Sequence, residues 1–193
     1  MSGLFAMINQ CSGERKLYIN LERPIVSYSN PKLVRNIVLK SRRLSRNDPL
    51  HYVTLNLTLL DTFDNKVKFN FYIYELLSNV YKRSFVEWHV AGCDFILKDS
   101  FLAPSVRATF EKSGNKLTCP APAGNYSLPN MSILITSIPK NFPFQTGRLY
   151  ANVTRLDEMV IKCHIDFQIK SYNAEKQTNQ TKQRLRKSIE NYK

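Results

Sequence analysis

From Cys119 to Lys170 the sequence is CPAPAGNYSLPNMSILITSIPKNFPFQTGRLYANVTRLDEMVIKCHIDFQIK. Its last ten residues alternate strictly, with polar residues between Ile161, Cys163, Ile165, Phe167 and Ile169. Alternation with a period of two is typical of a β-strand that has one buried face and one wet face. We therefore expect a strand over residues 161–170, with Cys163 on its buried side.

The same alternation recurs at residues 52–59, 67–74 and 149–154. The link at residues 61–66 has the length and polar composition of a hairpin connection between the first two of these strands. Weaker strands are expected at residues 16–21, 25–28, 37–39, 85–90 and 132–138. Several short strands separated by turn residues indicate an all-β sandwich or barrel.

Residues 100–112 interrupt the β pattern. Ala103-Pro104-Ser105 supplies a helix start, and Val106 and Phe110 suit one short helix. A chain of 193 residues with 43% hydrophobic content fits one domain with a full core. We expect an N-terminal segment at 1–15, the β-sandwich at 16–172, and a polar, basic tail at 173–193.

The C-terminal half carries a set of features in a recognisable order. They are Cys119-Pro120, the predicted turn Gly124-Asn125-Tyr126-Ser127-Leu128-Pro129, Pro139, Thr146-Gly147-Arg148-Leu149-Tyr150 and Cys163. This order resembles the ML lipid-recognition family, which includes the ganglioside activator protein, the Niemann-Pick type C sterol carriers and insect chemosensory proteins of the CheA/CheB type. The resemblance implies an immunoglobulin-like two-sheet antiparallel sandwich, with an apolar cavity between the sheets and one short helix at its rim.

The resemblance also implies two disulfides, Cys11–Cys163 and Cys93–Cys119. The residues alone leave three pairings open, as well as four reduced thiols. Disulfides require an oxidising compartment, and N-glycosylation sequons occur at Asn56, Asn125, Asn130, Asn152 and Asn179. Residues 1–8 lack the basic start of a secretion signal. We expect a truncated N-terminus and a secreted or lysosomal protein.

The inward apolar side chains could fill an ordinary core or line a cavity, since the alternation is the same in both cases. The resemblance favours a cavity. Its expected lining residues are Phe69, Phe71, Ile73, Leu149, Val153, Ile165 and Phe167, with Phe95, Phe101, Leu102 and Phe110 at the mouth.

No motif in the sequence supports catalysis. There is no Gly-x-Ser-x-Gly elbow and no phosphate-binding loop. His89, Cys93, Cys119, Cys163 and His164 lack the close spacing of zinc ligands. We therefore expect no enzyme activity, no metal and no cofactor.

The net charge of +13 attracts polyanions. The cations fall in two clusters, namely Lys32, Arg35, Lys40, Arg42, Arg43 and Arg46, and then Lys182, Arg184, Arg186 and Lys187. They suit docking on an anionic membrane or, equally, a solvated basic edge that prevents strand pairing between molecules.

The sequence predicts a carrier or presenter that holds a glycolipid, sterol, fatty acid or hydrocarbon and hands it to an enzyme, a receptor or a membrane. One alternative is an insect-type chemosensory, pheromone-related ligand-binding protein. A second is a basic polyanion- or nucleic-acid-binding protein. Nucleic acid is less favoured, because the chain has no recognisable reading motif and its aromatic residues fall mostly on the predicted buried face.

Overall fold

The structure, a computed structural model, describes residues 15–46, 48, 50–98, 102–113, 117–132 and 144–173. Both sheets lie in one compact unit, Tyr18–Lys170. Met1–Leu17 and Ser171–Lys193 form a second unit, of which only the ends of two strands are described.

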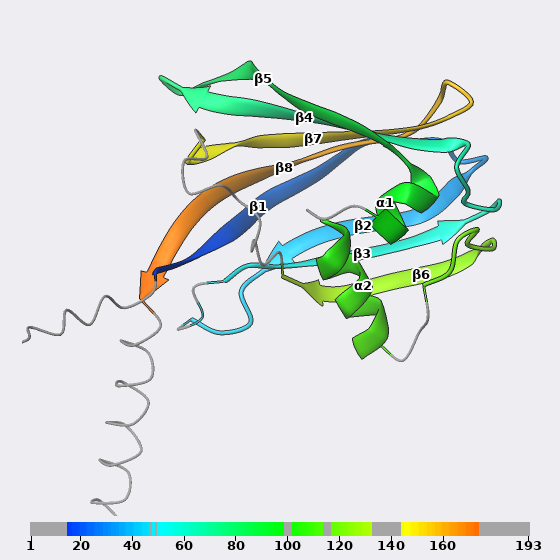
Figure 1. The fold of residues 1–193 in the computed structure, drawn as a ribbon, viewed down its shortest axis with the longest axis horizontal. Coiled ribbons are helices and arrows are strands. Elements are labelled where there is room, and N and C mark those ends of the chain that lie inside the picture. Colours follow the sequence, from blue (N-terminus) through cyan, green and yellow to red (C-terminus); the bar gives the residue numbers. More distant parts are fainter. Residues whose placement is uncertain are drawn as a thin grey trace, which may run out of the picture. The chain divides into compact units, whose positions relative to one another are not determined.

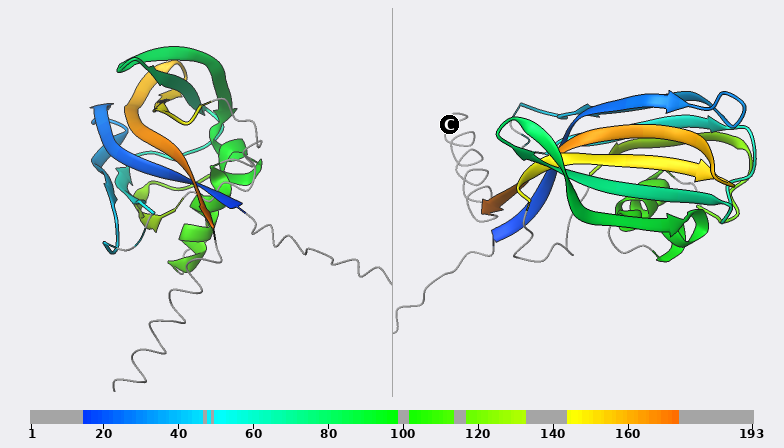
Figure 2. Two further views of the ribbon diagram at one scale, coloured as in Figure 1. Left: turned by 90° about the vertical axis from the view of Figure 1, so that its left-hand side faces the viewer. Right: turned by 90° about the horizontal axis from the view of Figure 1, so that it is seen from above.

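The described chain forms two antiparallel sheets and two short helices. Its elements are β1 (Arg15–Ser29), β2 (Val34–Arg42), β3 (Tyr52–Leu59), β4 (Val67–Leu77), β5 (Val80–Ala91), α1 (Gly92–Lys98), α2 (Ala103–Lys112), β6 (Gly124–Met131), β7 (Thr146–Arg155) and β8 (Glu158–Asn173). One sheet has the order β1-β8-β7-β4-β5 and the other the order β2-β3-β6. The two sheets face each other (Figures 1 and 2), so the predicted two-sheet sandwich is confirmed.

The alternating segments all form strands. β3 has the predicted bounds, whereas β4, β5, β7 and β8 are longer than predicted. The segments predicted at 16–21 and 25–28 merge into β1, which continues through Pro24. The strand expected at 132–138 lies almost entirely outside the described residues.

The link at residues 61–66 is not a hairpin, because β3 pairs with β2 and β6 while β4 pairs with β5 and β7. The link crosses between the sheets, and Phe63 forms a two-way backbone bridge with Ala121 on the way. Asp64 accepts a hydrogen bond from the Lys66 amide, as it would in a hairpin. The turn-forming residues at 61–66 therefore predict that the chain bends there, but they do not predict which strands pair.

Residues 124–129 form a strand and not the predicted turn. In β6, Leu128 is buried while its neighbours Ser127 and Pro129 are exposed, so the side chains alternate across the sheet. Pro129 is tolerated because β6 is an edge strand that pairs only with β3.

Two helices, and not one, follow β5. α2 occupies the predicted position, whereas α1 was not predicted. Gly92 begins α1 at a point where a Cβ atom would lie 2.7 Å from the Asp64 carbonyl oxygen, so only glycine fits there.

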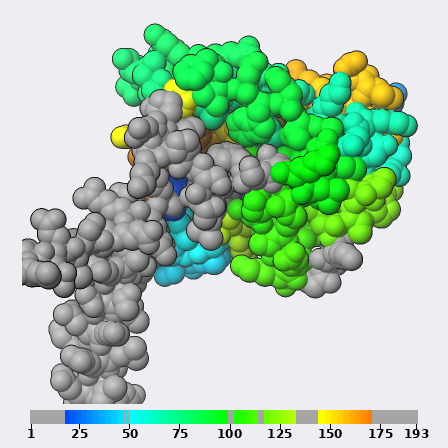
Figure 3. All heavy atoms as spheres, viewed as in Figure 1, coloured from blue at the N-terminus to red at the C-terminus, as the bar shows by residue number. Residues whose placement is uncertain are grey.

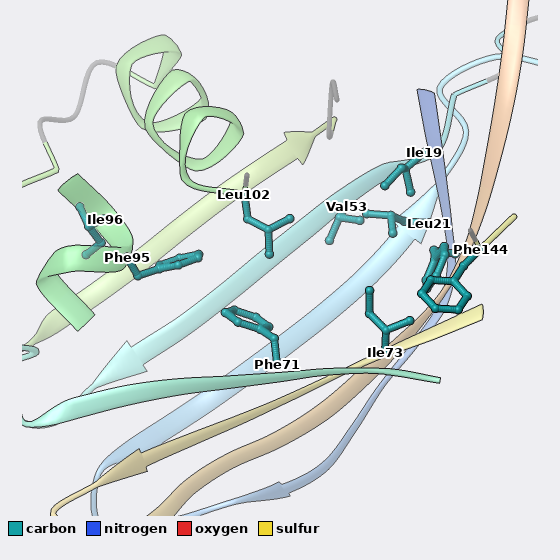
Figure 4. Close-up of a cluster of buried hydrophobic side chains, with 10 residues drawn as sticks. Ile19, Leu21, Val53, Phe71, Ile73, Phe95, Ile96, Leu102 and Phe144 are labelled. Carbon is teal, nitrogen blue, oxygen red and sulfur yellow. The ribbon is translucent and has the colours of Figure 1, made fainter. Parts of the chain in front are cut away.

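Two apolar clusters hold the sheets together. The first contains Ile19, Leu21, Val53, Phe71, Ile73, Phe95, Ile96, Leu102, Phe144 and Phe167. In Figure 4, Ile73 and Phe144 lie beside Leu21, while Phe95 approaches Phe71 from α1. The second cluster consists of Val34, Val67, Val153 and Val160.

Gly147 lies in β7 between β4 and β8, where no space is left for a side chain. A Cβ atom there would collide with the Tyr74 carbonyl oxygen and would lie 2.8 Å from Cζ of Phe167. We expect Gly147→Ala to lower the free energy of unfolding by about 2 kcal/mol, measured by urea denaturation, because overpacking forces backbone and side chain apart. The neighbouring Thr146→Ala, which removes atoms, is the control. Equal losses in both variants would contradict this explanation.

Candidate functional site

A cavity of about 310 Å³ lies between the two sheets. Its walls are almost wholly apolar and come from both sheets, from both helices and from the segments beside them. They include Val34, Ile37 and Leu39 of β2, Leu55, Leu57 and Leu59 of β3, Val67 and Phe69 of β4, Leu128 and Met131 of β6, Ala151 and Val153 of β7, and Val160, Ile161 and Cys163 of β8. Phe95, Ile96, Leu102, Val106, Phe110 and Leu117 complete the apolar wall.

The cavity lies between the two apolar clusters, because members of both line it. Its effect shows in β3, where Leu55, Leu57 and Leu59 point inward and yet stay only half-buried. Side chains in a filled core would lose nearly all their accessible surface. These leucines keep some of theirs because they border unfilled space.

The two helices form one wall of the cavity. Figure 1 places α1 and α2 between β5 and β6, and their atoms cover this edge of the sandwich in Figure 3. Arg107 of α2 donates to the Ile96 carbonyl at 2.6 Å and so joins the helices. Cys93 at the start of α1 is bonded to Cys119, with 5.4 Å between their Cα atoms.

The Cys93–Cys119 disulfide is the pair that the resemblance implies. It closes a loop of 26 residues, for which the chain-entropy account gives a stabilisation of about 3.5 kcal/mol. The bond anchors the helical wall to the segment that leads into β6.

One end of the cavity is polar. Asp61, Thr62 and Arg155 line it there, and Arg155 donates a hydrogen bond to the Asp61 carboxylate. This hydrogen bond lowers the pKa of Asp61, and the Thr62 amide contributes in the same direction. Asp61 is exposed as well as lining the cavity, so the cavity reaches the surface at this point.

The chain was compared with family models, curated proteins and solved structures. A family model described as "Protein of unknown function (DUF1091)" matches residues 67–151, which is less than half of the chain. No curated protein matches the sequence. Among solved structures, the chain is similar to chicken MD-1, solved in complex with lipid IVa, with 13% identity and a TM-score of 0.31 over 78% of this chain and 99% of that one.

The structure separates the predicted cavity residues into two groups. Phe69, Phe95, Leu102, Phe110 and Val153 line the cavity. Phe71, Ile73, Leu149, Ile165 and Phe167 instead lie in or against the first apolar cluster, and they fill space between the sheets. Phe101 lies outside the described residues.

Sequence reasoning missed the wall formed by β2 and β3. The alternation of β3 placed Leu55, Leu57 and Leu59 on one inward face, but no signal in that strand distinguishes a cavity wall from a core. The sequence feature that marks the cavity is in the other sheet. There Ala151 of β7 and Cys163 of β8, two small inward residues, pair in register and line the cavity.

Cys163, the expected partner of Cys11, is a free cysteine in the structure. Cys11 lies outside the described residues. The Cys163 thiol lines the cavity and lies 3.6 Å from the Ala151 carbonyl oxygen. Burial raises its pKa from the ordinary value of 9.0 to about 11.

The sequons lie on the outer faces of the strands. Asn125 and Asn130 are exposed, whereas Asn56 and Asn152 are half-buried. Asn125 accepts a hydrogen bond from Thr58 at 2.7 Å, and Asn56 accepts one from Ser127 at 2.8 Å. Asn179 lies outside the described residues.

Neither described helix is long and apolar enough to cross a membrane. In the part of the chain that the structure describes, no three His, Cys, Asp or Glu residues are grouped so that they could hold a metal ion.

The thiol of Cys163 provides a probe of the cavity. In a Cys11→Ser background, alkylation of Cys163 by iodoacetamide at pH 8 should be about 100-fold slower than that of an exposed cysteine. The reason is that only the thiolate reacts and the pKa is raised from 9.0 to about 11. The rate, followed by mass spectrometry, should keep rising with pH up to about 11.

A Cys163→Ser variant identifies the modified site. Alkylation at pH 8 as fast as in the urea-unfolded protein would show that the thiol is not buried in the cavity. In the chain with Cys11 present, complete resistance that a reductant abolishes would reveal the Cys11–Cys163 bond.

Proposed function

We propose that this protein is a secreted carrier or presenter that holds one apolar ligand between its two sheets and performs no catalysis. The apolar cavity of about 310 Å³ carries this proposal. Transfer of hydrocarbon from water supplies the driving force, at about 0.8 kcal/mol for each buried methylene. The Cys93–Cys119 disulfide and the exposed sequons at Asn125 and Asn130 support an oxidising, secretory environment.

The size of the cavity favours a small ligand. Its volume of about 310 Å³ lies at the low end of the range of roughly 300–1,000 Å³ for ligand pockets. A fatty acid, a hydrocarbon or another single-chain molecule fits this space better than a glycolipid with several chains. Within the carrier proposal, this volume therefore favours a chemosensory role with a cuticular hydrocarbon or pheromone as the ligand.

Ala151 offers a direct test. It lines the cavity on β7, where it pairs with Phe71 on one side and Cys163 on the other. We expect the ring of Ala151→Phe to fill part of the cavity. Roughly two methylenes of the ligand can then no longer be buried, so binding of a fluorescent fatty acid should weaken at least about tenfold. The melting temperature should stay the same or rise, because the added ring fills empty space.

The matched control is Ala108→Phe, the same substitution at an exposed position of α2. It should bind the probe as the unaltered protein does. Native mass spectrometry of the protein from a eukaryotic secretory host should also show a retained apolar molecule. If Ala151→Phe binds all tested fatty acids, sterols and hydrocarbons unchanged, or if no apolar compound binds either protein, the carrier proposal fails.

A further inference from the structure

Two connections lie at the same end of the sandwich, namely the one that leads from β2 to β3 and the turn between β4 and β5 (Figures 1 and 2). The described residues of the first connection include Asp48, Leu50 and His51. We call residues 42–46 and 77–85 together the basic end. Ser78 and Asn79 both have positive φ angles, which form the tight turn between β4 and β5.

The basic end exposes four large apolar side chains. Leu44 is 52% exposed, Leu77 41%, Val80 56% and Phe85 85%. Phe85 lies at an irregularity in β5, where residues 84–86 stand opposite the single residue Ile73 of β4. This bulge turns the ring out of the sheet, and such bulges are typical of edge strands that present a side chain.

The same end exposes cations that form no ion pair with another described residue, although Glu75 stands opposite Lys82 in the β4–β5 register. Arg42, Arg43 and Arg46 are exposed, and none of them forms an ion pair in the described structure. Arg42 donates only a side-chain hydrogen bond, to Asn130 at 3.3 Å. On β5, Lys82 is likewise exposed and outside every ion pair of the described residues, while Arg83 is paired with Glu87.

The opposite end of the large sheet differs in charge. The turn between β7 and β8 also exposes an apolar side chain, Leu156, at 73%. There it is followed by Asp157 and Glu158, both exposed. This turn therefore sets two acids beside its exposed apolar side chain, and Lys66 adjoins it as well, since the Leu156 amide donates to the Lys66 carbonyl. At the basic end the exposed apolar side chains share their segments with Arg42, Arg43, Arg46 and Lys82.

We propose that the basic end docks on an anionic lipid bilayer. Arginine and lysine near such a surface are attracted by its negative potential. Leu44 on one connection, and Leu77, Val80 and Phe85 on the other, enter the boundary between headgroups and acyl chains. Charge complementarity selects the bilayer, because a neutral apolar partner would gain nothing from the arginines. Docking does not require that the cavity hold a ligand.

The test is co-sedimentation of the full chain, stripped of ligand, with vesicles of phosphatidylcholine alone or with about 30% phosphatidylserine, which makes the surface negative. Binding should require phosphatidylserine and should weaken as salt rises. Replacing Arg42, Arg43 and Arg46 together by Gln should lower the partition coefficient roughly 100-fold, at about fivefold for each cation. Replacing Leu77, Val80 and Phe85 together by Ser should lower it at least about tenfold.

Two variants at the other end serve as matched controls. Lys32→Gln/Arg35→Gln/Lys66→Gln removes the same charge, and Leu156→Ser removes an exposed apolar side chain. Both should keep nearly full binding, and all variants retain the C-terminal tail, so differences between them belong to the altered residues. Circular dichroism and melting temperature check folding, and Phe85→Ser alone provides a milder variant.

Equal losses in the control and basic-end variants would overturn the proposal, as would binding that is independent of phosphatidylserine. The protein could instead bind immobilised heparin, with no loss in the Ser variants, and fail to bind vesicles. That result would assign the surface to a sulfated glycan. Fatty-acid binding in solution is measured separately on the same proteins. Failure of membrane docking is thereby distinguished from failure of the carrier proposal.

Discussion

The separation of the two sheets in the middle of the sandwich is the constraint on which the rest of the structure depends. Apolar clusters join the sheets on either side of the cavity, and the side chains between them do not fill the gap. Ordinary sandwiches interdigitate their side chains across about 10 Å. Here Ala151 and Cys163, two small residues paired in register, line the cavity together with the leucines of β3, and the helices form another part of its wall.

Alternation in the sequence was sufficient to predict β3, β4, β7 and β8 and the directions of their side chains. It could not predict the position of the cavity, because a period of two specifies the face of a residue and not its place along the sheet. Phe69 and Phe71 show this limit. They lie two residues apart on one face of β4 and their rings stack at 5.8 Å, yet Phe69 lines the cavity while Phe71 belongs to the first cluster.

Strand pairing was also beyond the sequence. The polar link at residues 61–66 contains the residues of a hairpin, but it bridges to Ala121 at Phe63 and then enters β4 of the other sheet. Residues 124–129 contain the glycine and proline of a turn, but they gain backbone hydrogen bonds with β3. In both places long-range pairing, which a local pattern does not encode, outweighs the turn chemistry.

The outer face of the large sheet explains how a sandwich with a cavity can remain rigid. Tyr150 lies against Tyr74 and His164, with ring centroids 4.7 and 5.2 Å away, so aromatic contacts run across β4, β7 and β8. Arg148 of β7 donates to Asp166 of β8 at 2.6 Å, and this hydrogen bond is the main cause of the raised pKa of Arg148.

These outer contacts tie adjacent strands together without using the inner face. The inner face is therefore free to carry small residues, because the large sheet does not depend on contacts through the cavity for its shape. Among the described residues, no ladder of backbone hydrogen bonds joins the helical wall to either sheet. It is held by the Cys93–Cys119 bond, by the hydrogen bond from the Cys93 amide to Asn65 and by apolar packing, so displacing it breaks fewer directional interactions than separating strands. A ligand that enters past α1 and α2 would leave both sheets intact.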